Sequence, residues 1–174
     1  MCASATAKRS RGCWQSSTDP SPGGAALSYD NWLVNTAIAC ATASAVAIAV
    51  LLHYEGLVLV SRGLAHLGVR RRTKVLYGIG SVLGLHIVEV WIFGLAYWLL
   101  LQIPGSGMVG SGPLQLLDAV YFSAVTFTTV GYGDLSPSGP IRLLAGMEAL
   151  TGFVLIAWSA SFTYLEMEQF WRAR

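Results

Sequence analysis

Three long apolar stretches are separated by polar or glycine-rich segments along the chain. Each stretch is long enough to cross a bilayer as a helix, which takes about 20 predominantly apolar residues. We therefore expect a membrane protein with three spans. The pattern predicts these spans from Trp32 to about Leu52, with an amphipathic continuation through Leu59, from Val75 to Ile103, and from Ile141 to about Leu165.

The segment between the second and third spans, residues 104–140, is apolar in its middle but broken by glycine and proline at both ends. Its first part, PGSGMVGSGP, predicts a flexible loop, and its last part, GYGDLSPSGP, is typical of turns. The apolar middle, from Asp118 to Phe127, is too short to cross a bilayer. That length favours a re-entrant helix, which enters the membrane and returns to the same side.

The composition agrees with a membrane protein, since 54% of the residues are apolar and only 11% are charged, against about 25% charged in soluble domains. The formal net charge of +2 is too small to indicate a nucleic acid or another strongly anionic partner. The cysteines Cys2, Cys13 and Cys40 form no CxxC pair and do not indicate a metal or redox site. A secreted disulfide scaffold and a wholly disordered chain are excluded on the same grounds.

The charged residues predict the orientation of the chain in the membrane. Seven of the eleven lysines and arginines fall on one side of a three-span arrangement, and the positive-inside rule makes that side cytoplasmic. They are Arg62, Arg70, Arg71, Arg72, Lys74, Arg172 and Arg174. We therefore expect residues 1–30 to form a disordered extracytoplasmic tail, residues 31–68 to supply an additional spanning helix and a basic cytoplasmic connection, and the C-terminus to be cytoplasmic.

The sequence TTVGYGD, residues 128–134, carries the most specific chemistry of the chain. A short helix that ends at Phe127 would direct the partial negative charge of its C-terminus into the membrane, where it favours a cation. Gly131 and Gly133 can adopt positive φ without a steric penalty, so the backbone can turn successive carbonyl oxygens toward one side. Four chains around an axis would stack those oxygens into rings that replace the hydration shell of a potassium ion.

With these residues the chain resembles the pore module of potassium channels, which consists of an outer helix, a pore helix, a selectivity filter and an inner helix. The resemblance covers about residues 75–170. It implies that residues 129–133 form the filter. A tyrosine at position 132, where some relatives carry aspartate, favours potassium selectivity within that family. The implied ligands of K+ are the carbonyl oxygens of Thr129, Val130, Gly131 and Tyr132, with the hydroxyl of Thr129.

The same resemblance assigns supporting roles to residues around the filter. Thr128 precedes it, Asp134 matches the acid that follows it, and Asp118 matches the residue that caps the start of the pore helix. Tyr121 and Phe122 occupy the positions of two aromatic residues that brace the filter, where tryptophans are common. We expect Tyr121 to donate a hydrogen bond to Asp134, as the first of those aromatics often does.

We expect an all-α, homotetrameric, potassium-selective channel in the cell membrane, with residues 69–174 as its pore domain. Its outer helix is expected at 75–103, its pore helix and filter at 113–134, and its inner helix at 141–166. Gly152 matches the hinge glycine of the inner helix, and close packing against the pore helix explains it equally well. Passive flux requires neither enzymatic chemistry nor a cofactor, so the expected partners are K+ ions, the bilayer and further copies of the chain.

Two other functions stay open at this point. A channel-like subunit that does not conduct would carry the same filter motif. An intramembrane aspartyl protease would use the GxGD sequence at residues 131–134 together with Tyr29 and Asp30, because two aspartates that share a site divide the acid and base roles. Tyr29 and Asp30, however, precede the first predicted span, and such an enzyme would need more spans.

Ionisable residues inside the predicted spans form a second candidate site. His86 and Glu89 share one face of the second span near the bilayer centre. They predict either a proton-sensitive pair that biases gating or a structural hydrogen-bonded pair, and Glu148 of the third span could join this pair or meet the pore helix. A metal site formed by His86, Glu89 and Glu148 is a further alternative. We expect His53 and Glu55 at the cytoplasmic interface, with their polar ends toward water.

Overall fold

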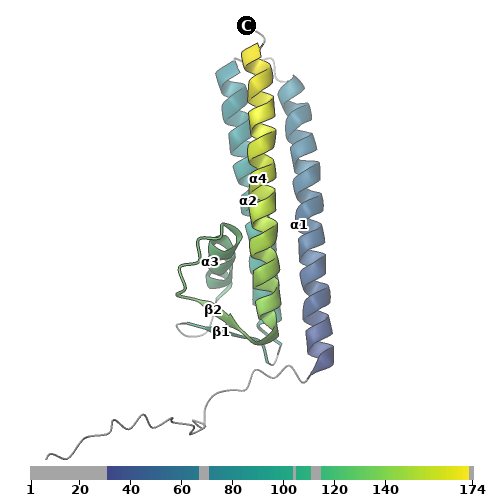
Figure 1. The fold of residues 1–174 in the computed structure, drawn as a ribbon, viewed down its shortest axis with the longest axis vertical. Coiled ribbons are helices and arrows are strands. Elements are labelled where there is room, and N and C mark those ends of the chain that lie inside the picture. The colour runs from purple at the N-terminus through teal and green to yellow at the C-terminus, as the bar shows by residue number, and fades with distance from the viewer. Residues whose placement is uncertain (1–30, 67–70, 104, 111–114, 173–174) are drawn as a thin grey trace, which may run out of the picture.

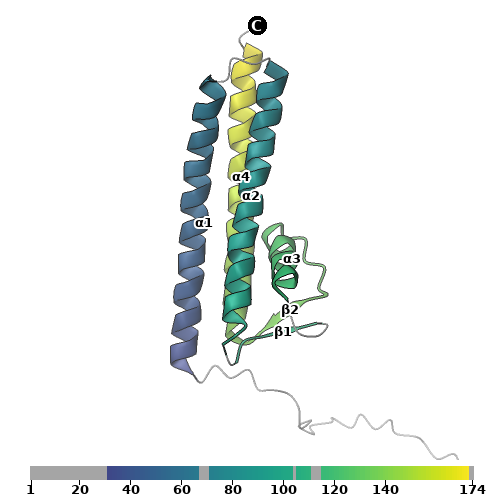
Figure 2. The same cartoon turned by 180° about the vertical axis from the view of Figure 1, so that it is seen from behind.

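The fold is built from three long helices that run side by side, α1 (Trp32–His66), α2 (Arg71–Leu100) and α4 (Arg142–Arg172). The computed structural model describes residues 31–66, 71–103, 105–110 and 115–172. A short helix, α3 (Leu116–Phe127), lies on the opposite side of α2 and α4 from α1 (Figures 1 and 2). By length and composition the three long helices can cross a membrane, as predicted, whereas the 12 residues of α3 are too few.

Helix α1 is longer than the sequence pattern predicts and continues to His66. The expected continuation stopped at Leu59, and the structure shows His53 on the buried face of the uninterrupted helix. This face contacts both α2 and α4, and its residues recur every three or four positions, as expected for a helix buried on one side. They are Ile38, Thr42, Ala45, Ala49, His53, Leu57, Val60 and Leu64.

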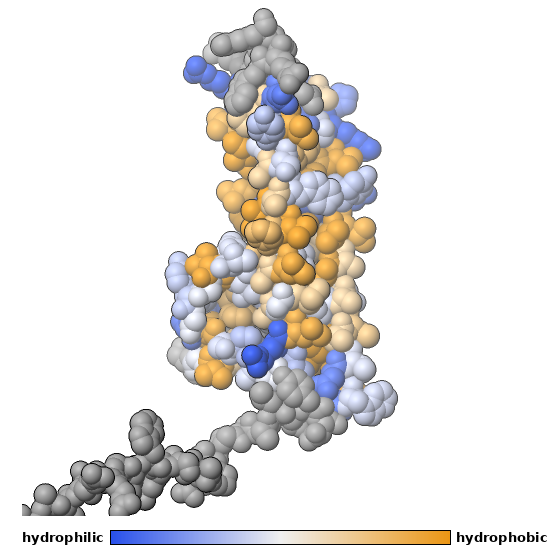
Figure 3. Space-filling view, in the orientation of Figure 1, coloured by the Kyte–Doolittle hydropathy of each residue, from blue (hydrophilic) through white to orange (hydrophobic). Residues whose placement is uncertain are grey.

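On the face seen in Figure 3, the bundle is mostly apolar over its middle and more hydrophilic toward its two ends. Large apolar side chains are exposed on all three long helices, among them Leu51, Leu83 and Phe153. An apolar surface of this extent would be unfavourable in water and suits lipid or protein neighbours. The structure therefore fits a chain that crosses the membrane several times.

A two-stranded antiparallel sheet, which the sequence pattern did not predict, joins the segments on either side of α3. Strand β1 (Gly107–Val109) pairs with β2 (Ser136–Ser138), with Gly107 opposite Ser138 and Val109 opposite Ser136. We expected flexible loop and turns here, and the pairing instead ties the chain before α3 to the chain after residues 128–134. A single 3-10 turn, η1 (Gly139–Ile141), then leads into α4.

The strands and the ends of the long helices distinguish the two ends of the bundle. Helix α1 begins at the end where β1 and β2 lie, and α4 ends at the other end, where α1 ends and α2 begins (Figure 1). Helix α2 ends at Leu100, slightly before the predicted Ile103, and α4 extends past the predicted position 166.

Candidate functional site

Helix α3 positions the sequence TTVGYGD at the point where the chain turns back. It begins at Leu116, within the range 113–134 expected for the pore helix and filter, and Asp118 lies in its first turn. The Asp118 carboxylate accepts a hydrogen bond from the backbone N–H of Gln115 at 2.9 Å, which satisfies a donor that the helix start leaves free. Asp118 thus contacts the start of the helix, where the sequence predicted a capping residue.

The backbone of residues 129–133 alternates in handedness. Thr129, Gly131 and Gly133 have φ angles of +59°, +56° and +79°. Two glycines were expected to adopt such angles, but Thr129 was not. It is the one non-glycine residue with positive φ in the described part of the chain, and a left-handed conformation costs an L-residue about 1–2 kcal/mol. Backbone strain of this kind is concentrated at functional sites, where the surrounding structure enforces it.

Hydrogen bonds hold the start of this segment against the last turn of α3. The backbone N–H groups of Thr129 and Gly131 donate to carbonyl oxygens of Thr126 and Val125, at 2.9 Å and 3.2 Å. The Thr128 hydroxyl donates to the Ala124 carbonyl oxygen at 2.7 Å. These hydrogen bonds fix the start of the segment to the end of α3. Residues 128–134 are nevertheless exposed in the single chain.

Tyr121 and Phe122, expected as a bracing pair, point to different neighbours. The Tyr121 hydroxyl donates a hydrogen bond to the Asp134 carboxylate at 2.8 Å, which is the predicted contact. This hydrogen bond raises the pKa of the Tyr121 hydroxyl, so the phenol keeps its proton and stays the donor. Phe122 is buried and packs edge-on against Tyr97 of α2, with 5.0 Å between ring centroids.

A hollow of about 250 Å³ lies where residues 127–129 face α4. The end of α3 and the first residues of TTVGYGD form one wall. Four residues of α4 form the other wall, namely Phe153, Ile156, Ala157 and Ala160. The C-terminal end of α3, with its partial negative charge, therefore lines this hollow.

Gly152 is the point of closest approach between α4 and α3. A Cβ atom at this position would overlap the backbone carbonyl oxygen of Phe127, the last residue of α3. The geometry agrees with the packing explanation of this glycine. Helix α4 runs without interruption through Gly152, and the hinge role stays a prediction.

Glu148 is fully buried and joins three helices. Its carboxyl group accepts a hydrogen bond from the Tyr97 hydroxyl of α2 at 2.6 Å and is hydrogen-bonded to the Ser123 hydroxyl of α3. The Ser123 oxygen is also 2.8 Å from the carbonyl oxygen of Val90. The sequence allowed Glu148 to contact either the His86–Glu89 pair or the pore helix. In the structure it contacts the short helix α3.

His86 and Glu89 form the predicted pair, but their third partner is His53 of α1. The two Glu89 carboxylate oxygens are 2.7 Å from His53 Nδ1 and 2.9 Å from His86 Nδ1. His53 and Glu89 are both 0% exposed. The expectation that His53 turns its polar end toward water is therefore wrong, and so is a metal site that includes Glu148, because the Glu148 carboxyl group is hydrogen-bonded to Tyr97 and Ser123. Glu55 is exposed, as expected.

Comparisons with known proteins address the same part of the chain. Residues 85–168 match the model of a protein family described as ion channel. The inward rectifier potassium channel Kirbac3.1 of Paramagnetospirillum magnetotacticum is 37% identical over 87 residues, 49% of this chain and 28% of the relative. The chain resembles a potassium-channel pore module.

Two plant proteins are also similar to part of the chain. Two pore potassium channel c of Oryza sativa subsp. japonica is 32% identical over 88 residues, 45% of this chain and 19% of the relative. Two-pore potassium channel 1 of Arabidopsis thaliana is 55% identical over 42 residues, 24% of this chain and 12% of the relative. The similarity thus covers less than a third of each of these three relatives. The family match begins within α2 and does not include α1.

The protease hypothesis needs a second aspartate, and its candidate residues Tyr29 and Asp30 lie outside the described residues. Of the other predicted site residues, those from Asp118 to Asp134 gather around α3 and the segment after it. His86 and Glu89 form a separate cluster with His53. This histidine was missed, although it lies four residues after Ala49 on the buried face of α1.

Proposed function

We propose that the chain forms a homotetrameric, potassium-selective channel that conducts K+ passively across the cell membrane. In each copy, α3 acts as a re-entrant pore helix and residues 129–133 form the selectivity filter. K+ binds to the carbonyl oxygens of Thr129, Val130, Gly131 and Tyr132 and to the Thr129 hydroxyl. Residues 69–174 form the pore domain, and residues 31–68 supply the additional helix and the basic connection.

The alternating backbone of residues 129–133 supports this function most strongly. Positive φ at every second residue turns peptide carbonyls that would otherwise point to opposite sides toward the same side. Rings of such carbonyls replace the hydration shell of K+ in potassium filters. The strained φ of Thr129 fits this function, since a plain turn between two helices has no need of a left-handed threonine.

Exposure of the same residues supports the tetramer. One chain supplies one quarter of such a ring, and Val130 and Tyr132 are 55% and 72% exposed in the single chain. Phe153 of α4, which lines the hollow below these residues, is 64% exposed. In the proposed assembly these side chains face neighbouring copies and the hollow opens into a shared inner cavity.

The remaining partners follow from the membrane setting. The apolar outer surface of α1 and α2 contacts the lipid bilayer, the N-terminus is extracytoplasmic, and the C-terminus is cytoplasmic. Downhill movement of K+ needs no cofactor and no catalytic residue. Gly152 either packs α4 against α3 in all states or bends during gating.

Flux through the purified chain in liposomes tests the function. We expect K+ flux well above Na+ flux in the wild type, and a loss of at least about tenfold in Gly131→Ala, because alanine strains the φ of +56° at this position. Gly80→Ala is the matched control. Gly80 lies on the exposed surface of α2, nothing lies within 4 Å of an added Cβ, and its flux should match the wild type.

The outcomes separate the alternatives. Equal K+ and Na+ flux would contradict a selective filter. No flux between about pH 5 and 8 from a tetramer confirmed by its mass would favour the non-conducting subunit. A monomer that does not assemble would contradict the proposal altogether.

A further inference from the structure

We propose that His53, His86 and Glu89 form a binding site for a divalent transition-metal ion of the Zn2+ type, which ties α1 to α2 beside the end of α3. The three residues offer one ligand atom each, and these atoms all lie within 4.8 Å of one another. Two helices supply them, with His53 on α1 and the other two on α2. This site does not depend on whether the chain conducts ions.

The donor set has the chemistry that Zn2+ prefers. Two imidazole nitrogens and one carboxylate oxygen are common zinc ligands, with bond lengths of about 2.0–2.2 Å. In a tetrahedral site such ligands are about 3.4 Å apart. The two nitrogen–oxygen distances here are 2.7 Å and 2.9 Å, each to a different oxygen of the Glu89 carboxylate, so these pairs need to separate by about 0.5–0.7 Å. The metal then replaces the protons that now join them.

Ser159 of α4 provides the outer partner that a metal-bound histidine requires. A histidine that binds a metal through one ring nitrogen almost always donates the other N–H to an oxygen, which fixes the ring. The Ser159 hydroxyl oxygen is 3.2 Å from His53 Nε2, on the opposite side of the ring from Glu89. With Nδ1 on the metal, the Nε2–H of His53 donates to Ser159 without further rearrangement.

The negative charge of the Glu89 carboxylate also favours a bound cation. A buried carboxylate within a membrane is costly unless it is paired. Within the described residues, the partners of the Glu89 carboxylate are two histidines and no lysine or arginine. A proton on one imidazole would supply the missing charge as well. The convergence of three ligand atoms and the outer hydrogen bond of Ser159 favour the metal.

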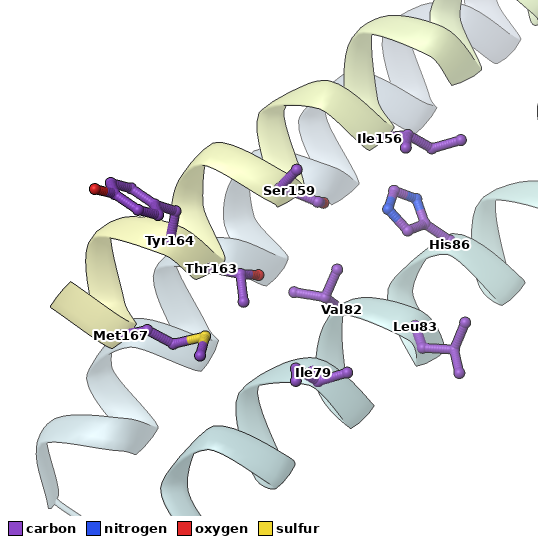
Figure 4. A pocket seen from close by; sticks show the side chains of 10 residues that line it. Ile79, Val82, Leu83, His86, Ile156, Ser159, Thr163, Tyr164 and Met167 are labelled. Carbon is purple, nitrogen blue, oxygen red and sulfur yellow. The ribbon is translucent and has the colours of Figure 1, made fainter. Parts of the chain in front are cut away.

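A cavity gives the ion a route to the site. A space of about 500 Å³ between α2 and α4 is lined by His86 and Ser159 together with mainly apolar residues. In Figure 4, His86 projects from α2 into this space toward α4, the helix that carries Ser159. The side chain of His86 is 16% exposed, whereas those of His53 and Glu89 are 0% exposed. His86 is therefore the ligand that an incoming ion meets first.

Metal binding to the purified full-length chain in detergent tests the proposal. Because free thiols also bind Zn2+, the measurements use a background in which Cys2, Cys13 and Cys40 are serine. After chelator treatment, the protein is equilibrated with Zn2+, and bound metal is measured by mass spectrometry and by competition with a chromophoric chelator. Co2+ is used in parallel, because histidine coordination produces visible absorption bands.

We expect about one Zn2+ per chain in the wild type. Affinity should fall at least about tenfold in His53→Gln and in His86→Gln, with loss of the Co2+ bands, and about tenfold in Ser159→Ala, which keeps all three ligands. His66→Gln is the matched control, since His66 is exposed at the end of α1, and its affinity should equal that of the wild type. Circular dichroism checks the helix content of each variant.

Three results would overturn the site. Binding far below one ion per chain in the wild type would show that the cluster holds only protons. Unchanged affinity in both ligand variants would place the metal elsewhere. Unchanged affinity in Ser159→Ala would contradict the geometry even if a histidine variant fails to fold. None of these results depends on flux, so the channel function and the metal site can fail separately.

Discussion

Glu89 and Glu148 are both fully buried glutamates in apolar helices, yet their neighbours differ in kind. Glu148 is surrounded by the hydroxyl groups of Tyr97 and Ser123, whereas Glu89 lies between the imidazole rings of His53 and His86. Hydroxyl groups satisfy a carboxyl group by hydrogen bonds but bring no positive charge. Imidazoles can carry a proton or bind a metal. A buried glutamate can therefore have a purely structural role, as at Glu148, or belong to a group that binds protons or a metal ion, as at Glu89.

The contacts of Ser123 show how closely the Glu148 carboxyl group is tied to two neighbouring helices. A serine hydroxyl has one hydrogen to donate, and its oxygen is within hydrogen-bond distance of both the Val90 carbonyl and the Glu148 carboxyl group. Ser123 of α3 thus contacts both α2 and α4 at this point. Glu89, facing two ring nitrogens, has no hydroxyl partner of this kind.

The largest expected effect comes from removing the side chain at position 148. Glu148→Ala leaves the buried hydroxyls of Tyr97 and Ser123 without this partner and opens a cavity between α2, α3 and α4. We expect the free energy of unfolding to fall by about 3 kcal/mol or more. Unfolding of the detergent-solubilised protein by dodecyl sulfate measures it. Glu55→Ala, at an exposed glutamate of α1, is the control and should change stability by less than about 0.5 kcal/mol.

Substitution by glutamine compares the two glutamates directly. Glutamine has the shape of a neutral glutamic acid, so Glu148→Gln can accept from Tyr97 and donate to Ser123, and should lower stability by less than about 1 kcal/mol. Glu89→Gln replaces an acceptor for two histidines with a group that accepts on one side only. We expect it to cost about 2 kcal/mol and to weaken Zn2+ binding. Equal losses in the free energy of unfolding for Glu148→Gln and Glu89→Gln would contradict the proposed difference between the surroundings of the two glutamates.

The parts of the site that are local in sequence could be predicted from the sequence. Asp118, Tyr121 and the segment 128–134 lie within 17 residues of one another, and their motif specifies both the turn and its supporting contacts. The hydrogen bond from Tyr121 to Asp134 was expected and is present. The left-handed Thr129 was not expected, because the propensity of threonine argues against positive φ and only the surrounding structure enforces it.

The contacts between distant segments could not be predicted. His53 and Glu89 are 36 residues apart, and their contact depends on the rotation of two helices about their own axes. A hydropathy drop at His53 looks the same for an interfacial residue and for a buried, paired one. The pairing of β1 with β2 is similar, because three-residue strands carry too little pattern to distinguish them from loops.

Gly152 lies one helical turn after Glu148 on α4, and both residues contact α3. Glu148 and Gly152 both hold α3 against α4, one by a hydrogen bond and the other by direct backbone contact with Phe127. In Gly152→Ala the added methyl group must displace the end of α3, at an expected cost of about 1–2 kcal/mol and with reduced flux. Gly146→Ala is the control, because nothing lies within 4 Å of its added Cβ. Normal stability with altered gating in Gly152→Ala would favour the hinge.

Removing one hydroxyl that contacts Glu148 should have a smaller effect than removing the carboxyl group itself. Tyr97→Phe deletes the hydrogen bond to Glu148 but keeps the ring that packs edge-on against Phe122. The loss of one buried hydrogen bond should lower the free energy of unfolding by about 1 kcal/mol. Zn2+ affinity should stay at the wild-type value, because Tyr97 contacts Glu148 and not the histidine cluster. A fall in Zn2+ affinity as large as that expected for Ser159→Ala would show that the two clusters are coupled through α2 and act as one unit.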